Sequence, residues 1–329
     1  MQKSEVASWK QALLAEVTHA LDLPYLCSLL DLIKAFDSVP FDHLSACGRR
    51  LGYNLYLLRL SIASYLLARV LDVDGCCSAF VWASRGLAAG SVLATIELRL
   101  LLLEAGDRLA SISIYCRLSL YVDDDATIET FCTNMRVVAE HSKAVNDFVT
   151  SLTDLRMQFS DTKNVVCPST SKLANAAVKA IRGIKISTSD RVVSLGTGLG
   201  AGTRRNMFQV RKRLTAFVSR KRRFQNLKRA RVCIARLLRS GGIAAMTFGS
   251  KTTGVSDSML LSQRRAAIAA TRVRTCGADL DLSLMLADGR GGAGADPAFD
   301  AHCGVLHMWA LAIWESWVPI GLMHMLIVC

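Results

Sequence analysis

The sequence lacks the short patterns that mark several common chemistries. It has 11 cysteines but no C-x-x-C pair, so it offers neither a zinc ribbon nor a thioredoxin-like redox site. It has no G-x-x-x-x-G-K-[ST] loop, no H-E-x-x-H and no G-x-S-x-G, which excludes three familiar catalytic signatures. The first residues also lack the apolar core of a secretory signal, so we expect reduced thiols and an intracellular location.

An uninterrupted apolar run long enough to cross a membrane is missing too. The one candidate, residues 301–329, is broken by Glu315 and Pro319. A spanning helix needs about 20 apolar residues without charge. We therefore expect no membrane partner, and we expect either a buried helix or a tail whose packing partner lies beyond residue 329.

Acidic residues are absent from one region in which basic residues are concentrated. Of the 40 Lys and Arg residues, 14 lie between residues 201 and 240, where there is no Asp or Glu. Removing those 14 from the 40 leaves 26, against 27 acidic residues, so this block accounts for the net charge of +13. Such a block predicts a local surface for a polyanion. The alternative is a solvated face that doubles as a nuclear-import signal.

The composition is typical of a folded protein with a sizeable core. The 329 residues are 51% hydrophobic and 20% charged, which suits about two domains of roughly 150 residues. Unevenly interleaved strand and helix periodicities predict an α+β domain that ends near residue 200. Its expected helices are 5–20, 41–70, 91–108 and 132–157, and its expected strands are 25–33, two between 111 and 130, a hairpin around Asp74-Gly75, and short strands near Val165 and Val193.

The remainder is predicted to be helical. Residues 201–288 contain the basic block and a second expected helix at 258–274, and residues 289–329 are read as a linker followed by the apolar tail. The basic block keeps helical spacing, with an expected apolar stripe of Leu214, Phe217, Val218, Phe224, Leu227, Ile234 and Leu238.

Two acidic clusters interrupt apolar strands. Asp31 and Asp37 flank the end of the first strand, and residues 123–125 are three consecutive Asp. Carboxylates held close together need solvent or cations, because they cannot all ionise unaided. Mg²⁺ prefers such hard oxygen ligands, and carboxylates from two strands can bridge a metal pair about 4 Å apart. The alternative for residues 123–125 is ordinary turn chemistry at a hairpin tip.

These clusters belong to a longer resemblance. The stretch from Asp31 to Val39 resembles the first palm motif of reverse transcriptases of the non-LTR retrotransposon and group II intron type. Four more segments follow in the family's order: residues 86–91 resemble the second motif, residues 121–124 (Tyr-Val-Asp-Asp) the third, residues 159–163 the fourth, and residues 194–196 the primer-grip region.

The resemblance implies a right-hand polymerase palm, an antiparallel sheet with packed helices, over residues 1–200, followed by a helical basic thumb over 201–288. It implies an RNA-directed DNA polymerase that adds deoxynucleotides to a primer 3′-end by two-metal nucleotidyl transfer. Asp31, Asp123 and Asp124 would bind two Mg²⁺ ions, with Mn²⁺ as an alternative, and Lys163 would protonate the pyrophosphate. The implied partners are an RNA template, a DNA primer and deoxynucleoside triphosphates, and the implied location is the nucleus, with the cytoplasm as the alternative.

Further roles follow from the same resemblance. Phe36 would contact the sugar and favour deoxynucleotides, and Gly90 and Tyr121 would also contact the nucleotide. The basic block would hold the template–primer backbone without reading sequence. The residues expected to do so are Arg211, Lys212, Arg213, Arg220, Lys221, Arg222, Arg223, Lys228 and Arg229.

The chain departs from the family in two places. Ala89 stands where the second motif usually has Gln, and only 30 residues precede Asp31, so most of the fingers segment is expected to be missing. One alternative is therefore a decayed or truncated remnant that only binds nucleic acid. A second alternative is an RNA-dependent RNA polymerase with the same palm, although Phe36 argues against it.

Overall fold

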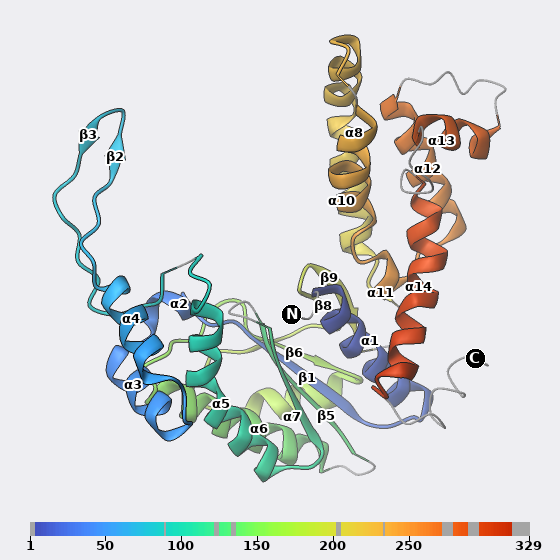
Figure 1. Ribbon diagram of the computed structural model, residues 1–329. Coiled ribbons are helices and arrows are strands. Elements are labelled where there is room, and N and C mark those ends of the chain that lie inside the picture. The colour runs from blue at the N-terminus through green and yellow to red at the C-terminus, as the bar shows by residue number, and fades with distance from the viewer. Residues whose placement is uncertain are drawn as a thin grey trace. The chain divides into compact units, whose positions relative to one another are not determined.

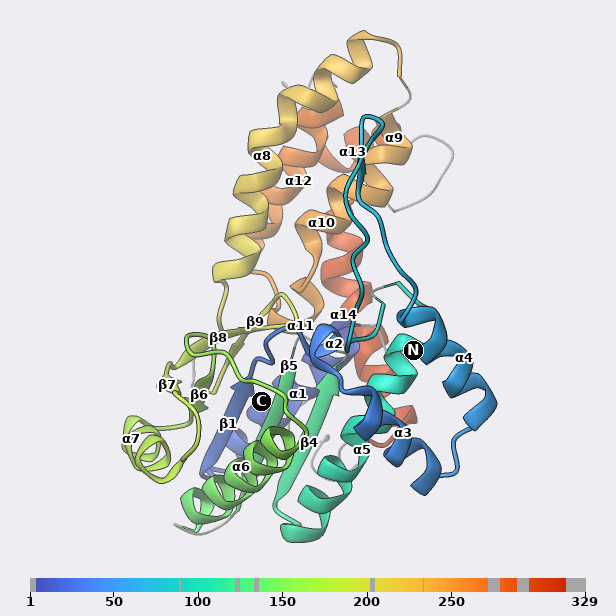
Figure 2. The same ribbon diagram turned by 90° about the vertical axis from the view of Figure 1, so that its left-hand side faces the viewer.

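A computed structural model shows an α+β protein with a mixed five-stranded sheet. It describes residues 4–88, 90–121, 125–132, 136–201, 205–232, 234–271, 279–288 and 296–317. The chain forms two compact units, shown in Figures 1 and 2. We call residues 23–190 the sheet unit, and residues 1–22 with 191–329 the helical unit. This division differs from the three expected segments, because the first 22 residues and the tail both belong to the helical unit.

The sheet unit is built on five strands in the order β4-β5-β1-β6-β7. Neighbouring strands are antiparallel except for β6 and β7, which are parallel. The strands are β1 (Tyr25–Leu30), β4 (Cys116–Tyr121), β5 (Asp125–Phe131), β6 (Val165–Pro168) and β7 (Ser187–Thr188). The expected strand at 25–33 and the strand–turn–strand at 111–130 are thus confirmed in type, although β1 ends at Leu30.

Helices pack against this sheet to form the core. The central strand β1 is buried along its whole length, and its Leu26 and Leu30 pack with Leu98, Phe148 and other apolar side chains. The helices are α2 (Ala35–Ser38), α3 (Phe41–Arg50), α4 (Leu55–Tyr65), α5 (Ala94–Ile112), α6 (Val137–Asp154) and α7 (Ser171–Ala180). The helices expected at 91–108 and 132–157 are confirmed as α5 and α6, and the 41–70 region forms two helices, α3 and α4.

A two-stranded ribbon extends from the end of α4 (Figures 1 and 2). It consists of β2 (Asp72–Val73) and β3 (Cys76–Cys77), joined at Asp74-Gly75 as expected. Asp74 and Gly75 both have positive φ, 53° and 82°, as a tight two-residue hairpin turn requires.

The helical unit contains the hairpin β8 (Arg191–Ser194) and β9 (Thr197–Gly200) and a set of helices. The helices are α1 (Ser4–Ala20), α8 (Phe208–Arg229), α9 (Ile234–Leu237), a π-helical stretch (Leu238–Ile243), α10 (Ala244–Thr247), α11 (Ser250–Thr253), α12 (Asp257–Thr271), α13 (Leu280–Asp288) and α14 (Pro297–Trp314). The helices expected at 5–20 and 258–274 are confirmed as α1 and α12, and most of the linker expected at 289–297 lies outside the described residues.

The apolar stripe expected in the basic block is only partly right. Phe217, Ile234 and Leu238 are buried, but Val218 and Leu227 remain 47% and 37% exposed. Successive residues of a helix are about 100° apart, so Val218 and Leu227 lie on either side of the line through Phe217 that meets α12. The buried arc of α8 is narrower than the spacing of its apolar residues predicts.

The described part of the apolar tail contains the helix α14, which packs against α11 and α12 and also against α1 at the other end of the sequence. Asp296 caps α14 by accepting a hydrogen bond from the Ala298 N–H. Trp9 of α1 lies edge-on to Trp309, 5.3 Å between ring centroids, and packs in the same buried cluster as Met308. No helix in the described part of the chain is long and apolar enough to cross a membrane.

Burial strongly shifts the pKa values of Glu129 and His141, two buried side chains of the sheet unit. The Tyr25 hydroxyl donates to Glu129 Oε1 at 2.8 Å, and burial raises the pKa of Glu129 to about 7, although Arg117 acts in the opposite direction. His141 lies between the hydroxyls of Ser28 and Thr130, at 2.7 and 2.8 Å. Burial lowers the pKa of His141 to about 3, so the imidazole is neutral at pH 7.

These shifts predict opposing pH dependences of stability. The folded state binds more protons at Glu129 between pH 4.5 and about 7, so this residue makes the free energy of unfolding fall as the pH rises. His141 makes it rise between pH 3 and 6.5. We expect Glu129→Gln to raise the free energy of unfolding at pH 8 by up to roughly 3 kcal/mol. In this variant the increase of the free energy of unfolding with pH that is due to His141 should remain, and the opposing decrease should disappear. Urea unfolding between pH 4 and 8 measures this dependence, with Glu104→Gln, at a half-buried carboxylate paired with Arg50, as the control. Identical profiles for Glu129→Gln and the unchanged protein would contradict the prediction.

Candidate functional site

Asp31 is the first residue after the central strand, and its backbone is held from two sides. Its N–H donates to Asn164 Oδ1 at 3.0 Å, and its carbonyl accepts from the Ser160 N–H at 2.8 Å. The side chain is 24% exposed. The carboxylate is therefore fixed at the end of the sheet while one part of it stays open to solvent.

Lys163 lies against this carboxylate. Its Nζ is 3.2 Å from Asp31 Oδ1, although the two residues are 132 positions apart in the chain. The structure thus brings together two residues predicted for the site, Asp31 and Lys163. The cation that the structure places beside the Asp31 carboxylate is the Lys163 ammonium.

Asn164 holds the turn that carries Lys163. It is 1% exposed, it accepts from the Asp31 N–H, and it donates to the carbonyls of Ser160 and Lys185. The Ser160 hydroxyl in turn accepts from the Lys163 N–H at 3.3 Å. Sequence reasoning did not select Asn164, and its one signal is a polar residue placed directly before the apolar strand β6.

The segment of the second motif pairs with the segment of the first. The Gly86 N–H donates to the Val39 carbonyl at 2.9 Å, and the Leu87 N–H donates to the Phe36 carbonyl at 2.8 Å. Gly86 has φ of 96°, and a Cβ there would lie 2.8 Å from the Asp37 carbonyl oxygen, so only glycine fits.

A buried network anchors the end of the same loop. The Tyr65 hydroxyl donates to Glu97 Oε2 at 2.7 Å and lies 3.0 Å from the Ser91 hydroxyl. Tyr65 and Glu97 are almost fully buried, and burial is the main reason that the pKa of Tyr65 rises to about 12. Ser91 directly follows Gly90, which is exposed and has φ of 88°. This network was not predicted from the sequence.

Two further predicted residues, Phe36 and Tyr121, lie at or near the same end of the sheet. Phe36 is half-buried and packs against the core. Tyr121 is the last residue of β4 and pairs with Asp125, while Leu30 pairs with Ala126, so β1, β4 and β5 all reach this end. Asp123, Asp124 and Ala89 lie outside the described residues.

The donors at this end suit a divalent cation. The Asp31 carboxylate is a hard oxygen ligand with an ammonium already beside it. The backbone of Leu32 lies opposite that of Phe159. The two hydrogen bonds between these segments run from the Ile33 N–H to the Gln158 carbonyl and from the Ser160 N–H to the Asp31 carbonyl, so neither of them uses the Leu32 carbonyl. The described residues therefore supply one carboxylate and one carbonyl oxygen as candidate ligands.

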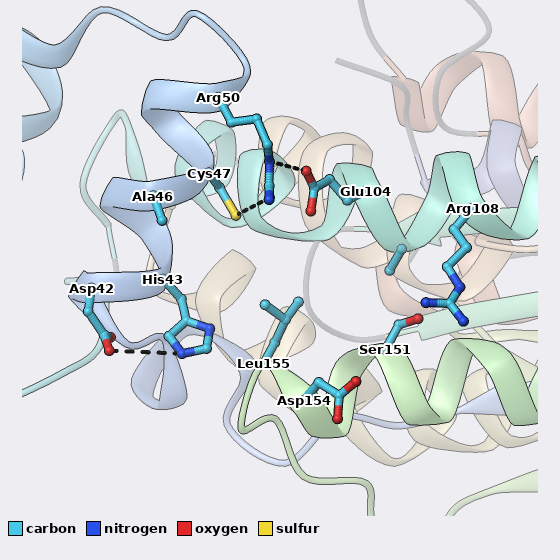
Figure 3. A pocket seen from close by; sticks show the side chains of 11 residues that line it. Asp42, His43, Ala46, Cys47, Arg50, Glu104, Arg108, Ser151, Asp154 and Leu155 are labelled. Carbon is cyan, nitrogen blue, oxygen red and sulfur yellow. Dashed lines mark hydrogen bonds and ion pairs between the residues drawn. The ribbon is translucent and has the colours of Figure 1, made fainter.

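A pocket of about 510 Å³ lies elsewhere in the sheet unit, among α3, α5 and α6 (Figure 3). Its charged groups are largely paired: Arg50 with Glu104, and Arg108 with Asp147. None of the predicted site residues lines this pocket. Asp154 also lines the pocket, as do His43 and Asp42, which lie 3.9 Å apart.

The helix α8 carries most of the basic block, and its cations divide into two groups. Arg213 and Lys228 bond to backbone carbonyls. Half-buried Arg213 donates to the Phe248 carbonyl at 2.9 Å, with its guanidinium 4.6 Å from the Phe248 ring. Lys228 is exposed, but it donates to the Thr271 carbonyl at 2.6 Å. Burial lowers the pKa of Arg213. Both residues therefore have structural roles that the sequence prediction did not include.

The other group is open to solvent. Among the described residues, none of its members forms an ion pair with a carboxylate. A helix of 22 residues is about 33 Å long, so these charges form an extended positive surface. Its exposed members, which we call the α8 cations, are Arg211, Lys212, Arg220, Arg222, Arg223 and Arg229, and Lys221 is half-buried beside them.

No protein-family model matches the chain, and the comparison with curated proteins finds no match either. The functional interpretation therefore depends on the geometry described above.

Proposed function

We propose that the chain is the palm and thumb of a retroelement reverse transcriptase, an RNA-directed DNA polymerase. The observation that supports this proposal best is the convergence on Asp31 of segments far apart in sequence. Residues 86–91 hydrogen-bond to the segment after Asp31, and residues 159–163 bring Lys163 to its carboxylate. The sheet unit would be the palm, and the helical unit would contain the thumb.

The proposed chemistry is two-metal nucleotidyl transfer. Asp31, Asp123 and Asp124, with the Leu32 carbonyl, would hold two Mg²⁺ ions, or Mn²⁺. When bound, such ions lower the pKa of a primer 3′-hydroxyl and neutralise charge on the triphosphate. The chain's own residues would do the rest: Asn164 fixes the Asp31 backbone, and Lys163 donates a proton to the departing pyrophosphate.

The substrate contacts follow from the same arrangement. Phe36, Gly90 and Tyr121 would contact the incoming deoxynucleoside triphosphate, with Phe36 against the 2′ position of the sugar. The α8 cations and Lys221 would contact phosphates of an RNA template and DNA primer, because arginine and lysine neutralise backbone charge without reading bases. A reverse transcriptase of this type would act in the nucleus, where a retroelement is copied.

The steric role of Phe36 provides the test of substrate class. We expect Phe36→Val to increase ribonucleotide incorporation on the order of 10-fold or more, since the ring would no longer meet a 2′-hydroxyl. Single-nucleotide extension on an RNA template, with deoxy- and ribonucleotides compared, measures this, in a chain preceded by a family fingers segment. Phe41→Val is the control, because it alters an aromatic side chain packed on the same core but outside the five motif segments.

The same assay separates the alternatives. An RNA-dependent RNA polymerase would use ribonucleotides before any substitution. Ala89 in place of the family's Gln favours the other alternative, a decayed or truncated remnant that only binds nucleic acid. Binding of primer–template without any incorporation would establish that candidate and exclude the polymerase.

A further inference from the structure

We propose that Lys163 is the resident counter-ion of Asp31 and that a divalent cation binding at Asp31 displaces it. The lysine would then be free to act as a proton donor only when metal is present. This inference depends on the proposed function, because it assigns an order to the use of two groups at that same site.

The two partners differ in their freedom to move. Asp31 is bonded through both its N–H and its carbonyl, and its side chain is 24% exposed. The Lys163 side chain is 68% exposed and carries its ammonium on a flexible four-carbon stem. A cation arriving at the carboxylate therefore finds Asp31 fixed, and it is the ammonium that moves away.

The competition is weak enough to be reversed by a divalent ion. The equilibrium constant for forming a largely exposed lysine–carboxylate pair favours the paired state by at most a few-fold. A doubly charged ion has twice the attraction for the carboxylate at the same distance. Its binding would be opposed by the lysine only about two- to five-fold, and the released ammonium would stay close by, because the Lys163 N–H remains bonded to Ser160.

The release matters for the order of the reaction. The primer 3′-hydroxyl gives its proton to water as its oxygen bonds to the α-phosphorus. The bond from that phosphorus to the bridging oxygen breaks, and the electron pair leaves with pyrophosphate. The Lys163 ammonium gives its proton to that oxygen and later recovers one from water. An ammonium still paired with Asp31 would point at the carboxylate, so the donor becomes available only at an occupied site.

A nearby ion pair provides the matched control. Lys185 lies 3.7 Å from Asp161, and both side chains are highly exposed, at 78% and 74%. This pair has no predicted metal role. Lys185→Met removes the same charge from the same unit without changing the partner of Asp31.

The first measurement is Mn²⁺ binding to the full chain, followed by the electron paramagnetic resonance signal of the free ion. Lys163→Met should tighten Mn²⁺ binding about two- to five-fold, Lys185→Met should not change it, and Asp31→Asn should abolish it. If Mn²⁺ binds through Asp31 but Lys163→Met leaves the affinity unchanged or weaker, the exchange is wrong while the metal site stands. If neither the unchanged protein nor Lys163→Met binds Mn²⁺, the metal site and the exchange both fail.

The second measurement follows the lysine itself. A brief pulse of an amine-acetylating reagent, read by peptide mass spectrometry, should modify Lys163 about two- to five-fold more in Mg²⁺ than without it. Lys185 in the same sample should be modified equally under both conditions, and Asp31→Asn should show high Lys163 modification regardless of Mg²⁺. Lower or unaltered Lys163 modification in Mg²⁺ would overturn the displacement.

Discussion

Asp31→Asn is expected to abolish metal-dependent nucleotide addition, lowering its rate on the order of 1000-fold or more, with the fold intact. The amide matches the carboxylate in size, and the backbone bonds to Asn164 and Ser160 do not involve the side chain. What is lost is a negatively charged metal ligand. Losing several kcal/mol of transition-state stabilisation from the metals corresponds to a loss of this size.

Single-nucleotide extension by a chain preceded by a fingers segment measures the effect. Asp161→Asn is the matched control, since this exposed carboxylate lies in the same turn as Lys163 but pairs with Lys185. Equal thermal unfolding of both variants would show that the fold is kept. Extension by Asp31→Asn at close to the normal rate would remove Asp31 from the reaction, and Asp123→Asn is expected to behave as Asp31→Asn does.

The local part of the fold was predictable from the sequence. The apolar run after Tyr25 gives β1, the helical spacings give α1, α5, α6 and α12, and Asp74-Gly75 gives its hairpin. In each case the signal is a period or a turn residue within about 20 positions, which is the range over which such patterns carry information. β1 was expected three residues too long, because the hydrogen bonds of Ile33 and Ser160 that redirect the chain there come from a distant segment.

The site was predictable only where the resemblance supplied residues. Asp31 and Lys163 were selected and lie together, whereas Asn164 and the pair Tyr65 and Glu97 were not. Their roles arise from hydrogen bonds between segments up to 133 positions apart, and no period in the sequence records such pairs. Asn164, Tyr65 and Glu97 are common residue types, and nothing in their local sequence marks them.

In the basic block, the sequence could not show which cations bond to neighbouring segments of the chain. Charge alone grouped Arg213 and Lys228 with the residues expected to contact phosphates, but their partners in the structure are the carbonyls of Phe248 and Thr271. A helix places residues around its whole circumference, so some members of any dense charged block must face the neighbouring helix. Which members do so depends on where α12 and α10 pack, and that is tertiary information.

Replacing Arg211, Arg222 and Arg229 with Gln is expected to weaken binding of primer–template on the order of 100-fold at 0.1 M salt. These three residues are exposed and lie along one line of α8, since spacings of 11 and 7 residues return to nearly the same side of a helix. Each phosphate contact contributes about 0.9 to the slope of log K against log salt. If the six α8 cations each meet a phosphate, the slope should be near −5, and the triple variant should flatten it by about 3 units without creating sequence preference.

A salt titration of binding to a labelled duplex measures both quantities. The control is Gln at Lys172, Lys179 and Arg182, three exposed cations on or just after α7 that remove the same net charge from the sheet unit. A second comparison is Arg213→Gln. It should lower the free energy of unfolding and leave the slope of log K against log salt nearly unchanged, because this side chain binds the carbonyl and packs on the ring of Phe248. Equal loss of affinity in the α7 and α8 variants would mean that net charge alone attracts nucleic acid. A slope that the α8 substitutions do not change would show that this helix does not contact phosphates.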